Sequence, residues 1–194
     1  MLIALEGLDQ SGKETQTRLL RDRIRATGLK ARAVSFPDYG TAIGEEIARA
    51  LQGEREYEAE AMQLLYVANR YERRPDLDRW CKAGITLVCD RYVASSIAYG
   101  EAQGLDPDWL HDIQRFLPKP NLTIFLDIKP ETSVSRKTTG RDRYELDLAL
   151  QIRVRDSYLR QSKQPGWVLV NGELTMLEVA AVITEEVESK LEKL

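Results

Sequence analysis

A glycine-rich turn follows a short apolar run at the start of this chain, and the pair limits the folds open to the remaining residues. Residues 1–15 read MLIALEGLDQSGKET, in which Gly7, Gly12 and Lys13 match the P-loop spacing G-x-x-x-x-G-K. Apolar residues 2–5 predict a buried strand before the turn. Leucine and isoleucine at helical spacing predict a helix over residues 13–27 after it.

Phosphate chemistry explains why this turn contains glycine. Without a Cβ the backbone can bend tightly around a phosphate, and consecutive N–H groups then point inward. The positive end of the following helix adds to the charge of Lys13. We therefore predict that residues 7–15 bind the β- and γ-phosphates of a nucleotide.

One position departs from the P-loop pattern. Glu14 stands where a metal-binding Ser or Thr normally follows the lysine, and Thr15 comes one residue later. Three interpretations stay open: carboxylates elsewhere hold the metal, Glu14 itself reaches it, or Glu14 points to solvent.

Composition indicates one domain, residues 1–194, because no linker-like segment divides the chain. The 28 basic and 31 acidic residues are well mixed, which argues against a nucleic-acid partner or a membrane-surface patch. No signal peptide or transmembrane run is present, so we expect a cytoplasmic protein. The single histidine, His111, excludes a histidine-rich metal site, and Cys81 and Cys89 have no metal-ligand spacing.

Five apolar segments alternate with helical patterns along the chain. The expected strands are residues 2–5, 30–36, 85–90, 122–126 and 167–170. The expected helices are residues 13–27, 42–51, 58–81, 92–103, 107–118, 144–163 and 177–194, with another beginning at Pro130. This alternation predicts an α/β fold, a doubly wound parallel sheet of five strands flanked by helices.

Polar side chains follow the expected strands, at the sheet edge where open α/β proteins bind ligands. Asp90 and Arg91 end a buried strand, where a charged pair is costly without partners. Tyr66 and Arg70 share one helix face, suited to stacking a base and binding a phosphate or carbonyl. Spacing alone leaves a core tyrosine beside a solvated arginine equally open.

The basic segment SRKTTGRDRYE, at about residues 136–145, has two interpretations. A run of charges is usually a solvated loop. In a chain with a P-loop, it can also be a lid that closes over phosphates.

Together these segments resemble the thymidylate kinase family over essentially the whole chain. The motifs that carry the resemblance are EGLDQSGKETQ at residues 6–16, FPDYGTAIG at 36–44, ANRYE at 68–72, DRYVASSIAYG at 90–100 and RDRYE at 141–145. The resemblance implies a P-loop nucleoside monophosphate kinase that transfers the ATP γ-phosphoryl group to dTMP with Mg²⁺, in dTTP biosynthesis. It also implies a homodimer built from mid-chain helices.

The same resemblance assigns roles to individual residues. ATP would contact the P-loop residues Gly7, Leu8, Asp9, Gln10, Ser11, Gly12, Lys13, Glu14 and Thr15. The substrate dTMP would contact Asp9, Phe36, Pro37, Tyr66, Arg70, Arg91, Ser95, Ser96, Tyr99 and Tyr144. Asp90 would bind Mg²⁺ through water, and Glu14 is a second candidate for that role. Because Gln10 is uncharged, the arginine that neutralises the transferring phosphate must come from the lid, where Arg136, Lys137, Arg141 and Arg143 are candidates. The expected catalytic set is Lys13, Asp9, Arg91, Arg141 and Arg143.

Alternatives remain at this stage. In the FPDYG loop, several members of the family that this chain resembles carry an arginine near the acceptor phosphate, whereas this chain has Asp38 and Tyr39. Asp38 would repel the phosphate and weaken acceptor binding unless it points away or pairs with a neighbouring arginine. The fold also suits a kinase for dUMP or a deoxynucleoside, or a catalytically impaired nucleotide-binding homologue. A GTP-dependent switch would need an N-K-x-D motif, which the sequence lacks.

Overall fold

The computed structural model describes residues 1–136, 144 and 147–191, and strands and helices alternate along them. The strands are β1 (Leu2–Glu6), β2 (Ala31–Ser35), β3 (Thr86–Asp90), β4 (Leu122–Asp127) and β5 (Trp167–Asn171). The helices are α1 (Lys13–Ala26), α2 (Ala42–Leu51), α3 (Ala59–Lys82), α4 (Val93–Ala102), α5 (Pro107–Asp112), α6 (Pro130–Arg136), α8 (Leu148–Gln161) and α9 (Met176–Leu191).

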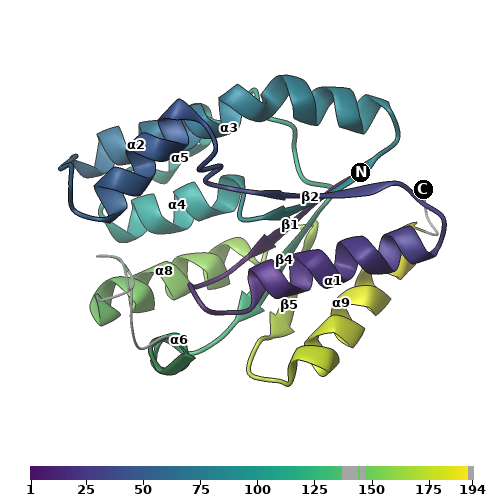
Figure 1. The fold of residues 1–194 in the computed structure, drawn as a ribbon. Coiled ribbons are helices and arrows are strands. Elements are labelled where there is room, and N and C mark those ends of the chain that lie inside the picture. The colour runs from purple at the N-terminus through teal and green to yellow at the C-terminus, as the bar shows by residue number, and fades with distance from the viewer. Residues whose placement is uncertain (137–143, 145–146, 192–194) are drawn as a thin grey trace.

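The strands form one parallel sheet in the order β2-β3-β1-β4-β5, which confirms the predicted fold class. Helices α1 and α9 pack on one face, while α3, α4 and α8 cover the other (Figure 1). Because β1 and β3 are neighbours, the P-loop after β1 and the Asp90–Arg91 pair after β3 lie at the same sheet edge.

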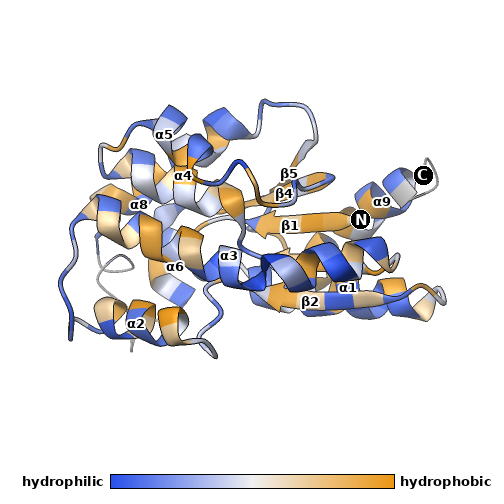
Figure 2. Ribbon diagram, turned by 90° about the horizontal axis from the view of Figure 1, so that it is seen from above, coloured by the Kyte–Doolittle hydropathy of each residue, from blue (hydrophilic) through white to orange (hydrophobic). Residues whose placement is uncertain are grey.

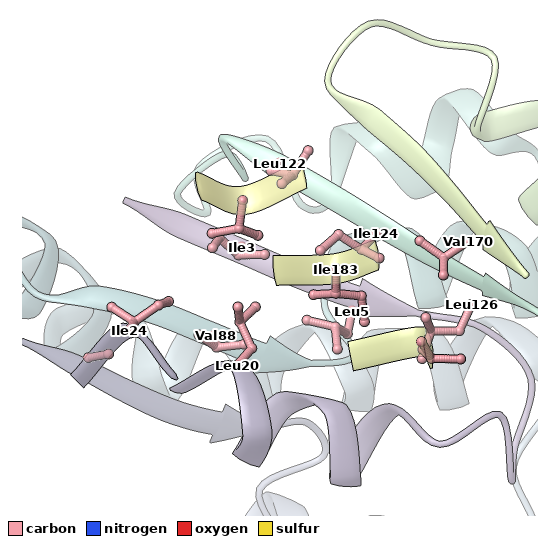
Figure 3. Packing of buried hydrophobic residues seen from close by; sticks show 13 residues of the cluster. Ile3, Leu5, Leu20, Ile24, Val88, Leu122, Ile124, Leu126, Val170 and Ile183 are labelled. Carbon is pink, nitrogen blue, oxygen red and sulfur yellow. The ribbon is translucent and has the colours of Figure 1, made fainter. Parts of the chain in front are cut away.

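Apolar runs in the central strands supply the core, and Figure 2 shows β1 as a continuous hydrophobic segment. On the α1 and α9 face, strand residues such as Ile3, Leu5 and Ile124 pack against Leu20 and Ile183 (Figure 3). Each of these side chains is buried, so the sheet is a rigid base for the loops at its carboxyl edge.

Two helices are shorter than the sequence predicts. Helix α5 ends at Asp112 rather than near Pro118, because the backbone continues in turns whose N–H groups bond three residues back. Helix α8 begins at Leu148 rather than Tyr144, because the Asp147 side chain accepts the Leu150 N–H and caps the helix there. Among the described residues, no helix has both the length and the apolar character needed to cross a membrane.

Candidate active site

The P-loop has the backbone geometry that its glycines predict. Gly7 has a φ of 146°, and a Cβ there would lie 2.6 Å from the carbonyl oxygen of Leu126. Gly12 has a φ of 92° and precedes the first turn of α1. Both positions therefore require glycine, one for space as well as conformation and the other for conformation alone.

Lys13 is buried at the start of α1, and its ammonium lies beneath the loop. Its Nζ donates to the carbonyl oxygen of Leu8 at 2.6 Å and to the Ser11 hydroxyl at 3.4 Å. Burial, reinforced by the positive charge of Arg91, lowers the pKa of Lys13 to about 8, although Asp9 and Asp90 act in the opposite direction. The charged form of Lys13 is therefore destabilised in the protein alone, and a bound anion would stabilise it.

A surface hollow opens above Lys13, between the P-loop and the end of β3. Its lining residues are Asp9, Gln10, Gly12, Lys13, Glu14, Thr15, Asp90, Arg91 and Arg136. Arg136, from the end of α6, donates to the carbonyl oxygens of Gln10 at 3.1 Å and Gly172 at 3.0 Å. Glu14 is exposed and lies 3.6 Å from Arg18 on the next turn of α1. Its placement fits the interpretation that it faces solvent.

Asp90 is the half-buried carboxylate of this hollow. Burial raises its pKa, and the charges of Lys13 and Arg91 oppose that shift. Within the described ranges, no three His, Cys, Asp or Glu side chains cluster as a complete metal site. One carboxylate beside a P-loop nevertheless suits Mg²⁺, which usually keeps several waters and takes its other ligands from substrate phosphates.

A second cavity lies on the other side of Arg91. Its lining residues are Asp9, Phe36, Pro37, Tyr39, Leu51, Gln63, Tyr66, Arg70, Arg91, Ser95, Ser96, Tyr99 and Tyr144. These residues come from the P-loop, the loop after β2, the turn after β3 and helices α2, α3 and α4, and Tyr144 precedes α8. The cavity therefore gathers all ten of the residues that the family resemblance assigned to dTMP.

Asp9 and Arg91 connect the hollow to the cavity. The Arg91 guanidinium forms an ion pair with Asp9, whose other carboxylate oxygen accepts the Tyr99 hydroxyl at 2.9 Å. Burial would raise the pKa of Asp9, but the charges of Arg91 and Lys13 and these hydrogen bonds together lower it to about 2. Asp9 is thus ionised and holds Arg91 between the two spaces.

Arg91 is placed by an unusual backbone as well as by its partners. Its φ of 61° lies in the left-handed region, which a side chain with a Cβ rarely adopts. Its N–H donates to the carbonyl oxygen of Leu5 at 2.9 Å, and its guanidinium donates to that of Gly7 at 3.1 Å. The strained turn directs the guanidinium back across the P-loop.

Behind Arg91, a buried carboxylate that the sequence analysis did not single out ties three elements together. Glu6, at the end of β1, accepts the Tyr92 N–H at 2.9 Å, the Ser95 hydroxyl at 2.6 Å and the Tyr158 hydroxyl of α8 at 3.0 Å. Ser95 in turn lies 3.3 Å from the Arg91 guanidinium, which donates to its hydroxyl. Glu6 therefore fixes the start of α4 on which Arg91 depends.

Arg70 is buried rather than solvated, which decides one of the open alternatives. Its guanidinium donates to the Ser96 hydroxyl at 2.7 Å and to the side-chain oxygen of Gln114 at 3.1 Å. Burial lowers its pKa. Tyr66 is half-buried one turn earlier on α3, so an aromatic ring and a buried cation face the same cavity.

Asp38 does not stand as an unpaired charge. Its carboxylate accepts the Arg73 Nε, and its main-chain N–H donates to the Asn69 side chain at 2.7 Å. The condition under which Asp38 would not repel a phosphate, pairing with an arginine, is therefore met.

Comparison with known proteins identifies the family of this chain. The family model for thymidylate kinase matches residues 5–183. The chain belongs to the thymidylate kinase family. Thymidylate kinase of Schizosaccharomyces pombe is 38% identical over 84% of this chain and 77% of its own. The human thymidylate kinase is 37% identical over 74% of this chain and 68% of its own. The solved structure of thymidylate kinase from Candida albicans superposes with a TM-score of 0.84 at 33% identity, covering 97% of this chain and 91% of that one.

The structure brings the residues that the resemblance assigns to dTMP into one cavity. Of the expected lid, residues 136–145, the structure describes Arg136 and Tyr144 alone. Arg141 and Arg143 lie outside the described residues. Sequence reasoning missed Glu6, Gln63, Leu51, Gln114 and Tyr158. Two of them had a signal: Glu6 ends an apolar strand in the same way as Asp90, and Gln63 lies on α3 three residues before Tyr66, on the same helix face. No local pattern identifies the other three, which come from α2, α8 and the turns after α5.

Proposed function

We infer that this chain is an ATP-dependent thymidylate kinase, which transfers the γ-phosphoryl group of ATP to dTMP and yields dTDP and ADP for dTTP biosynthesis. The observation that carries this inference is the thymidylate kinase match over residues 5–183. Named thymidylate kinases at 30–38% identity support the same activity. Neither dUMP, a deoxynucleoside nor loss of activity gains support from any comparison.

The donor, ATP, is assigned to the hollow beside the P-loop, residues 7–15. There Lys13 and the loop N–H groups would bind the phosphates, and the positive end of α1 would add to them. Asp90, with Glu14 as a weaker candidate, would hold Mg²⁺ mainly through water. The ion supplies positive charge to the phosphate oxygens, a role that suits phosphoryl transfer.

The acceptor, dTMP, is assigned to the cavity. Its base would lie against Tyr66 and near Arg70, with Phe36, Pro37, Ser95, Ser96 and Tyr144 as further walls. Its phosphate would meet Arg91, and Asp9 and Tyr99 would border the sugar. Because Asp9 and Arg91 line both spaces, the two substrates would meet at this pair, as an in-line transfer needs.

A cation must also neutralise the transferring group. Gln10 has no charge, and Arg136 already donates to two backbone carbonyls, so we assign this role to Arg141 or Arg143 of the lid, residues 136–145. An arginine of this kind contributes about 10³ to 10⁵ in rate.

Assembly, location and domain extent stay predictions. We propose a homodimer, supported by partly exposed apolar residues on α3, among them Leu64. The cytoplasmic location and the single domain over residues 1–194 stand as the sequence predicts them.

A coupled ADP-release assay with ATP and Mg²⁺ tests the activity, with dTMP, dUMP, dCMP, dGMP, AMP and thymidine offered in parallel. We expect fastest turnover with dTMP. Arg141→Ala or Arg143→Ala should lower kcat by about 10³ or more with little change in either KM, while Arg136→Ala should cost far less. Absence of turnover with every acceptor would refute the activity, and faster turnover with another acceptor would refute the assignment to dTMP.

A further inference from the structure

Gln63, on α3, is a polar side chain of the cavity to which no role has yet been given. It is 0% exposed and lies one helical turn before Tyr66, and both residues line the same cavity. Neither its amide nitrogen nor its amide oxygen has a hydrogen-bond partner among the described residues. A fully buried amide with both ends unpaired is rare in folded proteins.

This arrangement is unfavourable for the protein alone. Burying an amide without hydrogen bonds costs free energy that an apolar side chain of the same size would avoid. Two turns further along α3, the Nε of Arg70 is also buried without a partner in the part of the chain described. The wall of the cavity formed by α3 therefore presents unpaired donors and one unpaired acceptor.

Other acceptors of this cavity are already engaged. The Asp9 carboxylate binds Arg91 and Tyr99, and the Ser96 hydroxyl accepts from Arg70. The Gln63 oxygen is a neutral acceptor with capacity to spare. A ligand that offers an N–H beside a carbonyl oxygen would satisfy both ends of this amide.

We propose that Gln63 hydrogen-bonds the N3–H and carbonyl edge of the acceptor's pyrimidine base, directly or through one water. This inference rests on the acceptor cavity proposed above. Arg70 offers only donors, so it pairs with a base carbonyl and cannot accept the N3–H. A rotated Gln63 amide also matches the N3 acceptor and amino group of cytosine, so discrimination against cytosine comes from Arg70, whose donors oppose that amino group.

The substitution Gln63→Met tests the proposal because it keeps the length of the side chain and removes both hydrogen-bonding groups. We expect the ligand-free melting temperature to rise by about 2 to 4 °C, because an unpaired buried amide is gone. We also expect KM to rise about tenfold for dTMP and dUMP alike, with KM for ATP unchanged. The thermal shift induced by dTMP should shrink, while that induced by ATP should not.

A matched control is Thr17→Val. It also removes a buried and unpaired polar group, the Thr17 hydroxyl, but Thr17 lines neither the hollow nor the cavity. It should leave both KM values unchanged. Gln63→Leu provides a second apolar variant if the methionine variant does not fold. The role of Gln63 alone would be overturned if its variants left the KM and the thermal shift for dTMP unchanged while Tyr66→Ala weakened dTMP binding. An unaffected KM for dTMP in Tyr66→Ala as well would overturn the cavity assignment and this inference with it.

Discussion

At the scale of single residues, the site depends on charges that are held close together before any substrate arrives. Lys13 lies among Asp9, Asp90 and Arg91, and burial with the charge of Arg91 leaves its pKa at about 8. An ordinary lysine has a pKa near 10.4, so Lys13 loses its proton in a range where a surface lysine stays charged. A bound phosphate anion stabilises the ammonium and raises that pKa again.

ATP binding should therefore take up a proton in mildly alkaline solution. Below about pH 8 Lys13 is already charged, whereas above it the free protein must first bind a proton, so the affinity for ATP should fall by up to about tenfold per pH unit. Calorimetric titration near pH 8.5, in two buffers with different ionisation enthalpies, measures that proton uptake. In Lys13→Arg the proton uptake should disappear because guanidinium stays charged. An equal affinity for ATP at about pH 7.5 and about pH 9.5 would contradict the assignment of the ATP phosphates to Lys13.

At the scale of secondary-structure elements, local patterns predict the frame of the site but not its cross-links. The strand before Gly7, the helix after Lys13 and the strand that ends at Asp90 follow from apolar runs and glycine positions. The pairing of Asp38 with Arg73 spans 35 residues, and that of Glu6 with Tyr158 spans 152. Such contacts depend on strand order and helix packing, which no local period encodes.

Helices α4 and α8 meet along a buried seam that includes the Glu6 contacts. The Tyr158 hydroxyl lies 2.9 Å from the Ser95 hydroxyl and donates to Glu6, and its ring stacks on Phe125 of β4 at 5.1 Å between centroids. Ser95 is also the hydroxyl that receives a hydrogen bond from Arg91. Tyr158 thus connects α8, which follows the basic segment in sequence, to the arginine between the two substrate spaces.

The variant Tyr158→Phe should loosen that connection while keeping the ring packing. We expect a loss of about 1 kcal/mol in unfolding free energy, from one buried hydrogen bond, and a KM for dTMP raised severalfold because Arg91 is less well held. Denaturant unfolding and steady-state kinetics measure the two effects. Tyr57→Phe is the matched control, since its hydroxyl bonds Glu46 at 2.6 Å and lines neither substrate space. Lower stability with an unchanged KM for dTMP would show that Tyr158 serves the core alone.

At the scale of the whole molecule, α3 has two faces with different surroundings. One face carries Tyr66 and Arg70 toward the cavity, and the other carries Leu64, which is 48% exposed. Tyr71 lies two turns after Leu64 and donates to the carbonyl oxygen of Ile113, in the turn that also bears Phe116, 58% exposed. Leu64 and Phe116 are thus two large exposed apolar side chains, and an interface between copies of the chain would bury such surface.

If the outer face of α3 forms the proposed homodimer, its two copies meet by a twofold axis and each Leu64 is buried by the partner. Leu64→Glu then places a carboxylate in an apolar interface on both sides at once, so we expect sedimentation to change from dimer to monomer at micromolar concentration. The matched control is Leu177→Glu. Leu177 is 69% exposed on α9, and α9 packs with α1 on the opposite side of the sheet. It should stay dimeric. A monomeric parent protein would refute the dimer, and dissociation by Leu177→Glu alone would move the interface to α9. Because α3 also carries Tyr66 and Arg70, dissociation at Leu64 should raise KM for dTMP more than KM for ATP, whose proposed site lies on the far side of Arg91.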